Sequence, residues 1–465
     1  MKKAFLRLAA FLLGFALLIA AANRFFVKTD TFAALSMNEL KHRDDIELAI
    51  VGSSVVHAHF NAELITELTG LRTFSAGFSS AGLQASLAVT EELFRHSSPE
   101  WVVLVTEPFT LNMVKELEQA QYELMPHLSS PAIQLRYLLR TAREDGAYID
   151  RLFMFRQFGA ESLSDVAKSL ALHLCPEKAY AAMPPTGDPD MRYMGGGFVR
   201  VETDKRADDM VKEELVRACT GYDYNLMDGT KEMLLQYREL CEAHGAKLLV
   251  LAYPNMTALQ LARPDFLPYN ASLRRFCDAN GIPFANFVFA KPELYPRQDD
   301  LYFDLYHMVW EGADVLSTSF SRYFNALRRG EDQTALFYEN EEQYLASIDC
   351  ITNTWIQTYV PGSWNAAWEQ NEQAVSAAAA GKDVYLANCN HGTLLTPEYR
   401  FSLVGEDGTA APLTPWHREG MLVCAPGALT GKTLLVEARP EGRTDVPPVF
   451  YTWRPGIDPE PDLAN

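Results

Sequence analysis

The chain has 465 residues, of which 48% are hydrophobic and 22% charged, a balance typical of globular proteins and not of disordered ones. This length predicts two or three domains. Its 60 acidic and 41 basic residues give a net charge of −19, which would repel nucleic-acid phosphates, so we expect no nucleic-acid partner.

The N-terminus combines a basic start with an apolar segment. Lysines follow Met1, and Leu8–Ala22 carries no charge. This pattern is typical of a signal peptide cut after Ala22, or of an uncleaved anchor. We favour a membrane anchor over residues 1–27, because residues 25–27 extend the apolar run. The basic start then stays inside, which predicts a single-pass protein of the cell membrane with its body on the extracytoplasmic side.

Apolar runs and helical patterns alternate after the anchor. Strands are predicted at Ile46–Val51, at the start of 71–82, which ends in a small-residue loop, and at Trp101–Pro108, with helices at Asn61–Gly70 and 83–98 between them. The order strand, helix, strand, helix, strand is typical of an α/β fold with a parallel sheet and crossover helices.

The alternation stops at about residue 113 and resumes at about residue 226. Helical stretches and a Pro/Gly-rich piece fill this interval, which we interpret as a helical insertion. Beyond it, strands are predicted at 246–255 and 282–287, followed by a loop and a long amphipathic helix ending near Gly330. The predicted α/β domain therefore spans residues 28–330.

The C-terminal third has a different character. Residues 331–362 are acidic and predict a helical linker, and the short alternating strands of 363–456 predict a small β-sandwich, followed by a disordered tail over 457–465. Four tryptophans of this region could stack on sugar rings or could belong to its core: Trp364, Trp368, Trp416 and Trp453. The seven cysteines contain no CxxC motif, which excludes a zinc ribbon; a Cys389–Cys424 disulfide stays open.

A candidate catalytic set lies at the ends of two predicted segments. Ser53 and Ser54 follow the first strand, and Asp304 and His307 share the loop before the last helix. A nucleophilic serine needs exposure at a strand end, a histidine to take its proton and a carboxylate to fix the tautomer of that histidine. Either serine could be the nucleophile on this argument.

These blocks resemble the SGNH (GDSL-like) hydrolases. Gly52-Ser53-Ser54 is similar to the family's first block in a membrane-anchored, exported branch that includes the D-alanyl transfer protein of teichoic-acid modification and the alginate O-acetylation proteins. Over about residues 45–329 the resemblance implies a three-layer α/β/α sheet domain. It also implies Ser54 as nucleophile, His307 as general base and Asp304 as the group that orients it.

The resemblance further implies three donors for the tetrahedral oxyanion. Besides the backbone N–H of the nucleophile, the second block places a donor at Ser80, in a loop shaped by Gly77 and Gly82. The third block, Gly-x-Asn-Asp, is absent, because the strand Trp101–Pro108 continues with Phe109; Asn112 is displaced, and Asn255 could line the site instead. The D-alanyl transfer branch also lacks this motif.

Three other motifs have two interpretations each. His57 and His59 could bind a metal, but no third ligand is evident, so we expect one at the pocket rim, the other packed, and no cofactor. Residues 195–197, three glycines, could cradle a phosphate but follow no strand, and we expect a flexible loop. Three aromatic residues near His307 could stack on sugar or could be core residues: Tyr302, Phe303 and Tyr306.

Two functions follow as hypotheses. The first is an exported, membrane-anchored serine acyl esterase or O-acyltransferase that acts on an acylated envelope polysaccharide, with a membrane-bound O-acyltransferase as the partner that the resemblance implies. The second is a non-catalytic protein of polysaccharide modification that keeps the fold and holds polymer. The missing asparagine block favours the second function, whereas the Ser, Asp and His set favours the first.

Overall fold

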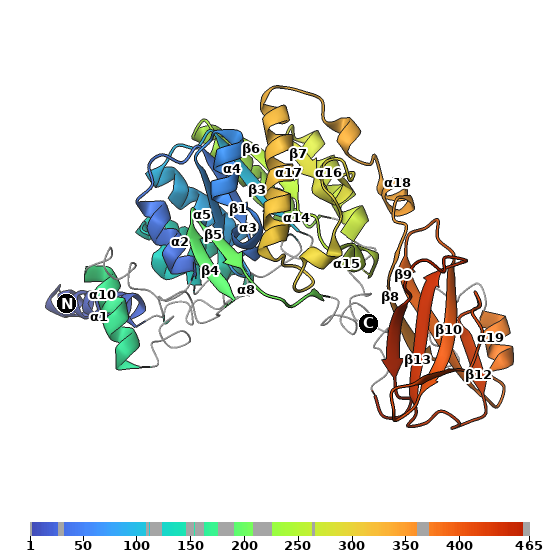
Figure 1. The fold of residues 1–465 in the computed structure, drawn as a ribbon. Helices are drawn as coiled ribbons and strands as arrows, with labels where there is room; N and C mark the ends of the chain where they lie inside the picture. Colours follow the sequence, from blue (N-terminus) through green and yellow to red (C-terminus); the bar gives the residue numbers. More distant parts are fainter. Residues whose placement is uncertain are drawn as a thin grey trace.

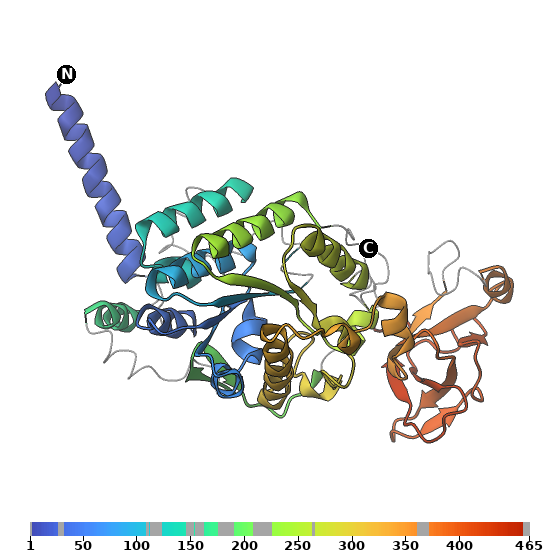
Figure 2. The same cartoon turned by 90° about the horizontal axis from the view of Figure 1, so that it is seen from above.

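A computed structural model describes residues 2–26, 32–107, 111, 123–145, 153, 162–174, 190–207, 226–262, 266–359 and 372–458. An apolar N-terminal helix, an α/β domain and a C-terminal β module follow one another along the chain (Figure 1). Helix α1 (Lys2–Phe25) projects from the α/β domain (Figure 2) and is long and apolar enough to span a membrane.

The α/β domain is built on a parallel sheet, as predicted. Its strand order is β2-β1-β3-β6-β7, and the bounds are Leu48–Gly52 (β1), Thr73–Gly77 (β2), Trp101–Thr106 (β3), Lys247–Ala252 (β6) and Phe284–Asn286 (β7). In the register, Leu48 lies beside Thr73 on one side and Trp101 on the other. The strands are continuous apolar runs because both faces of the sheet are covered.

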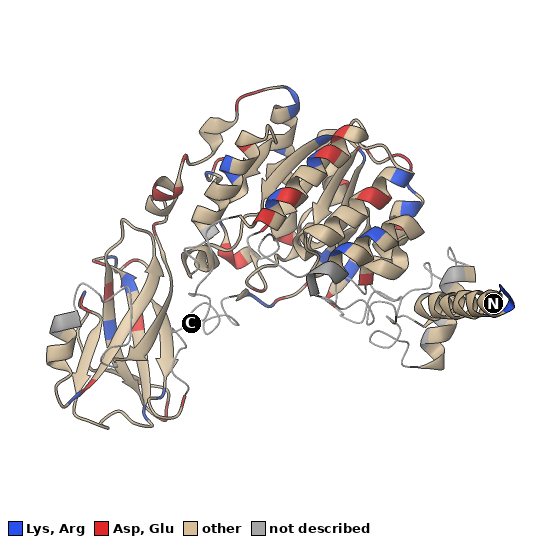
Figure 3. Cartoon of the chain, turned by 180° about the vertical axis from the view of Figure 1, so that it is seen from behind, with Lys and Arg blue, Asp and Glu red and all other residues tan. Residues whose placement is uncertain are grey.

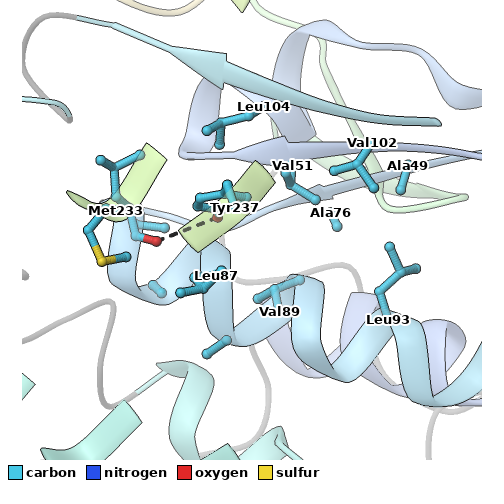
Figure 4. Packing of buried hydrophobic residues seen from close by; sticks show 14 of the residues in the cluster. Ala49, Val51, Ala76, Leu87, Val89, Leu93, Val102, Leu104, Met233 and Tyr237 are labelled. Atoms are coloured by element: carbon cyan, nitrogen blue, oxygen red, sulfur yellow. Dashed lines mark hydrogen bonds between the residues drawn. The ribbon is translucent and has the colours of Figure 1, made fainter. Parts of the chain in front are cut away.

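Helices cover the two faces and complete a three-layer arrangement. One face packs against α2 (Phe32–Lys41), α5 (Leu83–His96), α8 (Pro131–Asp145), α14 (Asp228–Ala243) and α16 (Phe266–Ala279). The other packs against α3 (Ser54–His59), α4 (Ala62–Thr69), α15 (Thr257–Ala262) and α17 (Trp310–Arg328). Figure 4 shows the first layer, where Val51 and Leu104 of the sheet face Leu87 of α5 and Tyr237 of α14.

The predicted insertion is helical only in part. Besides α8 and the short helix η1 (Met125–His127) it contains α10 (Leu163–Leu174) and a hairpin of β4 (Met191–Gly195) and β5 (Phe198–Val201). The glycines at 195–197 form the hairpin turn with positive φ values. The N–H of Gly196 and the hydroxyl of Tyr193 donate to the carboxylate of Glu39, at 2.9 and 2.7 Å. This turn therefore binds a carboxylate of its own chain.

The segment after α17, predicted as a helical linker, contains less helix than expected. It holds η5 (Thr334–Leu336) and α18 (Glu341–Ala346), and Tyr344 and Ile348 pack onto the α/β domain. Ile351–Thr358, part of the predicted linker, forms strand β8 of the C-terminal module. Two more short helices, η3 (Phe287–Phe289) and η4 (Asp299–Leu301), lie between β7 and α17.

The C-terminal module consists of two packed antiparallel sheets, as predicted. Their orders are β12-β9-β8 and β11-β10-β13-β14. The bounds are Asp383–His391 (β9), Pro397–Val404 (β10), Ala410–Pro412 (β11), Met421–Cys424 (β12), Thr433–Pro440 (β13) and Val449–Trp453 (β14), with helix α19 at Glu372–Ala378. Tyr385 of one sheet and Phe401 and Val436 of the other share one apolar core.

The tryptophans and cysteines of this module lie in different environments. Trp453 is 2% exposed and belongs to the core, so it cannot stack on a sugar. The guanidinium groups of Arg400 and Arg439 lie over the ring of Trp416, at 4.9 and 4.0 Å. Trp364 and Trp368 lie outside the described residues. Neither Cys389 nor Cys424 forms a disulfide.

Lys, Arg, Asp and Glu residues occur mostly on the outer helices and on the loops (Figure 3). The middle of α1 carries no charged residue, and its basic residues stand near its two ends in the sequence: Lys2, Lys3, Arg7 and Arg24. An uncharged centre with basic ends suits a helix that crosses a bilayer, because the charges can reach the interfaces.

Candidate active site

The turn after β1 brings two serines to the carboxyl edge of the sheet. β1 ends at Gly52, Ser53 adopts an extended conformation, and α3 begins at Ser54. A Cβ atom on Gly52 would lie 2.9 Å from the carbonyl oxygen of Val105 in β3. Only glycine lets the two strands approach so closely where the chain turns.

The two serines have different partners. The hydroxyl of Ser54 lies 2.8 Å from Nε2 of His307, whereas the hydroxyl of Ser53 donates to Oε1 of Glu107 at 2.7 Å. Ser53 is 4% exposed, and Ser54 is half-buried. Of the two candidates left open by the sequence, Ser54 is therefore the serine within reach of a histidine.

Asp304 holds His307 through both the ring and the backbone. The ring Nδ1–H donates to Oδ2 of Asp304 at 2.8 Å, and the backbone N–H groups of Tyr306 and His307 donate to Oδ1 at 2.7 and 2.6 Å. With Nδ1 protonated, Nε2 is free to accept the proton of Ser54. The structure thus joins the three predicted residues in the order Ser54, His307, Asp304.

Helix α17 ties the histidine loop to the serine helix. His307 lies three residues before α17. Asn61, at the junction of α3 and α4, binds this helix. The backbone N–H of Asn61 donates to Oγ of Ser317, and its side-chain amide donates to Asp314, both at 2.8 Å. These bonds fix the separation of Ser54 and His307.

The electrostatics of His307 suit a general base. Burial disfavours its charged form, but the hydrogen bond and charge of Asp304, together with the charge of Glu107, outweigh burial and raise the pKa of His307 above 6.5. Burial opposes the ionisation of Asp304, yet its hydrogen bonds to His307 and Tyr306 lower its pKa. Asp304 therefore stays ionised while His307 takes up and releases a proton.

His57 and His59 both lie inside the fold, and neither stands at a rim. Burial, with the charge of His307 second, lowers the pKa of His57 to about 4 and that of His59 well below 6.5. Nε2 of His59 accepts from the N–H of Met308 at 2.8 Å, and its ring stacks on Tyr253. Across the described residues, no three His, Cys, Asp or Glu side chains group in a way that could hold a metal ion.

Gly77 lies beside the turn after β1, and Ser80 follows it three residues later in the chain. Gly77 ends β2 and pairs with Gly52, and a Cβ on it would lie 2.6 Å from the carbonyl oxygen of Ser53 and clash with the backbone of His57. Ser80 has φ of +57°, the left-handed conformation that non-glycine residues seldom adopt. Such strain is typical of functional loops. Asn112 lies outside the described residues.

Asn255 borders a small space of about 10 Å³ together with Gln260, Tyr302 and Tyr344, and its carbonyl oxygen accepts from Gln260 at 2.6 Å. Neither Ser54 nor His307 lines this space. Tyr302 is 2% exposed and is a core residue. Among the aromatic candidates it is Phe303 that stacks on the ring of His307, with centroids 5.9 Å apart.

Sequence reasoning missed Glu107 as a member of the site. Its position had indicated only the loss of an asparagine motif. A usable signal was present, because a carboxylate directly after a buried strand, next to the strand that carries the nucleophile, must lie near the nucleophile in a parallel sheet. Glu107 is 6% exposed, and burial, partly opposed by the Ser53 hydrogen bond, raises its pKa.

A groove of about 580 Å³ lies at the start of α17. It is bordered by Trp310, three residues beyond His307, and by charged side chains of β5 and the following loop: Arg200, Glu202, Lys205 and Arg206. The guanidinium of Arg200 lies 4.1 Å from the centre of the Trp310 ring. The wall of this groove is therefore a stacked aromatic and cationic pair.

Comparisons with known proteins found only weak similarity. No protein-family model and no curated protein matches the chain. An acylhydrolase structure from Bacteroides fragilis is similar over 63% of this chain and 94% of its own, with 11% identity and a TM-score of 0.27. A GDSL-like lipase structure from Bacteroides thetaiotaomicron is similar over 64% and 100%, with 12% identity and a TM-score of 0.27. Likeness at this level leaves the function to the geometry of the site.

Proposed function

We propose that the protein is a membrane-anchored serine acyl esterase or O-acyltransferase with Ser54 as its nucleophile. The observation that carries the proposal is the hydrogen-bond chain from Ser54 through His307 to Asp304. A serine hydroxyl is a weak nucleophile at neutral pH and becomes effective when an oriented imidazole can take its proton.

The reaction follows from these contacts. Oγ of Ser54 attacks the acyl carbonyl carbon while its proton passes to Nε2 of His307. The tetrahedral intermediate collapses, and its leaving oxygen takes that proton, which leaves an acyl-enzyme. His307 then removes a proton from water or from an acceptor hydroxyl, whose oxygen attacks the acyl carbon. The bond to Oγ of Ser54 breaks, and Oγ takes the proton back from His307, which releases the free acid after hydrolysis or the new ester after acyl transfer. Backbone N–H groups at Ser54 and Ser80 are the proposed donors to the oxyanion.

The proposed substrate is an acylated envelope polysaccharide. Helix α1 would hold the domain at the outer face of the membrane, where a membrane-bound O-acyltransferase could supply acyl groups. The groove beside Trp310 suits a sugar chain, because aromatic faces and charged groups both bind hydroxyl-rich rings. The C-terminal module would then add a second contact with polymer or partner.

Covalent labelling tests the proposal. The full-length protein in detergent is treated with a fluorophosphonate probe, which modifies only activated serines. We expect labelling of the wild type, no labelling of Ser54→Ala, and retained labelling of a control that removes an exposed serine of the C-terminal module, Ser376→Ala on α19. Wild-type protein that resists the probe while folded would refute catalysis and favour the non-catalytic polymer-holding function.

A further inference from the structure

A buried carboxyl group at the edge of the site is not used by the proposed reaction. Glu107 follows β3, and the register of β1 with β3 pairs Val51 with Leu104. Ser54 and Glu107 each lie three residues beyond that pair, so the two strands deliver them to the same level. Oε1 of Glu107 accepts the hydrogen bond of Ser53 at 2.7 Å, directly before the nucleophile.

The titratable groups that interact with His307 come from three elements. Asp304 is on its own loop, Glu107 is at the end of β3, and His57 and His59 are on α3. Tyr253, which follows β6, stacks on His59. Burial keeps both histidines neutral and raises the pKa of the Tyr253 phenol, so it too is uncharged. Of these groups, only the carboxylates Asp304 and Glu107 bring charge to the imidazole.

We propose that Glu107 is a positioning residue of this site: through Ser53 it fixes the turn that presents Ser54, and its charge stabilises the imidazolium that His307 becomes during the reaction. This inference rests on the proposed serine acyl transfer. The protonated form of His307 and the ionised form of Glu107 favour each other, since each charge lowers the cost of burying the other. Asp304, from the loop before α17, and Glu107, from the end of β3, thus act on one ring.

The pH dependence of labelling separates this role from a packing role. Second-order rate constants for the fluorophosphonate probe are measured between about pH 5 and 9 on the full-length wild type and on Glu107→Gln. We expect Glu107→Gln to react at least about tenfold more slowly, with its acid limb moved to lower pH by about one unit. A residue that only packs would slow the reaction and leave the midpoint unchanged.

Two further variants sharpen the test. Glu92→Gln removes another buried carboxylate, on α5, that also accepts a hydrogen bond from a serine, Ser129. This variant should keep the labelling rate and the pH midpoint of the wild type. Ser53→Ala breaks the hydrogen bond but keeps the carboxylate, so it should slow labelling without lowering the midpoint. Should Glu107→Gln fail to fold, Ser53→Ala carries the test, and a Ser53→Ala protein of full rate overturns the proposal.

A second readout does not depend on activity. Diethylpyrocarbonate modifies neutral imidazoles, and peptide mass spectrometry follows its reaction at His307 as a function of pH. We expect the midpoint in Glu107→Gln to fall relative to the wild type. An unchanged midpoint overturns the role of Glu107 even if the probe labels Ser54; a lowered midpoint in a protein that the probe never labels supports this role and refutes the proposed function alone.

Discussion

Replacing Asp304 with asparagine tests how far the reaction depends on the tautomer of His307. The amide oxygen of asparagine can still accept the backbone N–H groups of Tyr306 and His307, which Oδ1 accepts at 2.7 and 2.6 Å, so the loop should keep its shape. The amide nitrogen, however, then faces Nδ1 in place of Oδ2, which accepts at 2.8 Å. Nδ1 must become an acceptor, and the proton moves to Nε2, where it blocks transfer from Ser54.

The expected loss is large because the ring then has no basic nitrogen toward the serine. In serine proteases the equivalent change costs about 10⁴-fold, or about 5.5 kcal/mol of transition-state stabilisation. The rate of fluorophosphonate labelling measures it. The acid limb should also move to lower pH, because the charge that raises the pKa of His307 is lost.

A matched control is available on α14. Asp228→Asn makes the same chemical change at the start of this helix, where the exposed carboxylate of Asp228 accepts from Lys231 at 2.9 Å, and should retain wild-type labelling. The thermal unfolding midpoint of each variant is measured as well, and a midpoint equal to that of the wild type shows that the variant is folded. A folded Asp304→Asn protein that reacts within about tenfold of the wild type would show that the ring needs no orienting carboxylate, and the mechanism would be wrong.

Two other predictions concern the scaffold of the site. Gly77→Ala should lower the free energy of unfolding by about 1–3 kcal/mol and slow labelling, because its Cβ would lie 2.6 Å from the carbonyl oxygen of Ser53. The control Gly229→Ala, which adds a Cβ in open space on α14, should do neither. Equal thermal midpoints for the two variants would contradict this prediction. His57 has a pKa of about 4, below 6.5, so its neutral ring contributes stability in full above pH 6.5 and loses that contribution as the pH falls toward 4. In urea unfolding, the free energy of unfolding should fall between pH 7 and 5, and this fall should be smaller in His57→Gln than in the wild type by roughly 2 kcal/mol. An identical pH dependence in both proteins would refute this role of His57.

The sequence was sufficient to predict the sheet and the order of the site residues. Apolar runs of five or six residues, such as that of β1, can be buried on both faces only in a parallel sheet with helices around it. The carboxyl ends of such strands meet at one edge, and this rule places Ser54. His307 follows from its Asp304 partner three residues earlier, at the start of the last helix.

Other features depended on contacts that a linear pattern does not contain. Which serine faces His307 is decided by the rotation of the chain after Gly52, which turns Ser53 inward to Glu107. Asn255 lies two residues past Tyr253 and lines a space that neither Ser54 nor His307 borders, which the strand pattern alone does not indicate. The triple glycine predicts a loop, but the anion it holds, Glu39, is 156 to 158 positions earlier in the chain.

The bonds from Asn61 to α17 have a consequence for the growing chain. Ser54 and His307 are 253 positions apart, and the insertion lies between them. A ribosome completes the nucleophile turn long before the base exists, and only docking of α17 on the α3–α4 junction joins them. Nascent or truncated chains therefore carry an ordinary serine hydroxyl. In the proposed reaction, Ser54 therefore becomes reactive only once the fold is complete.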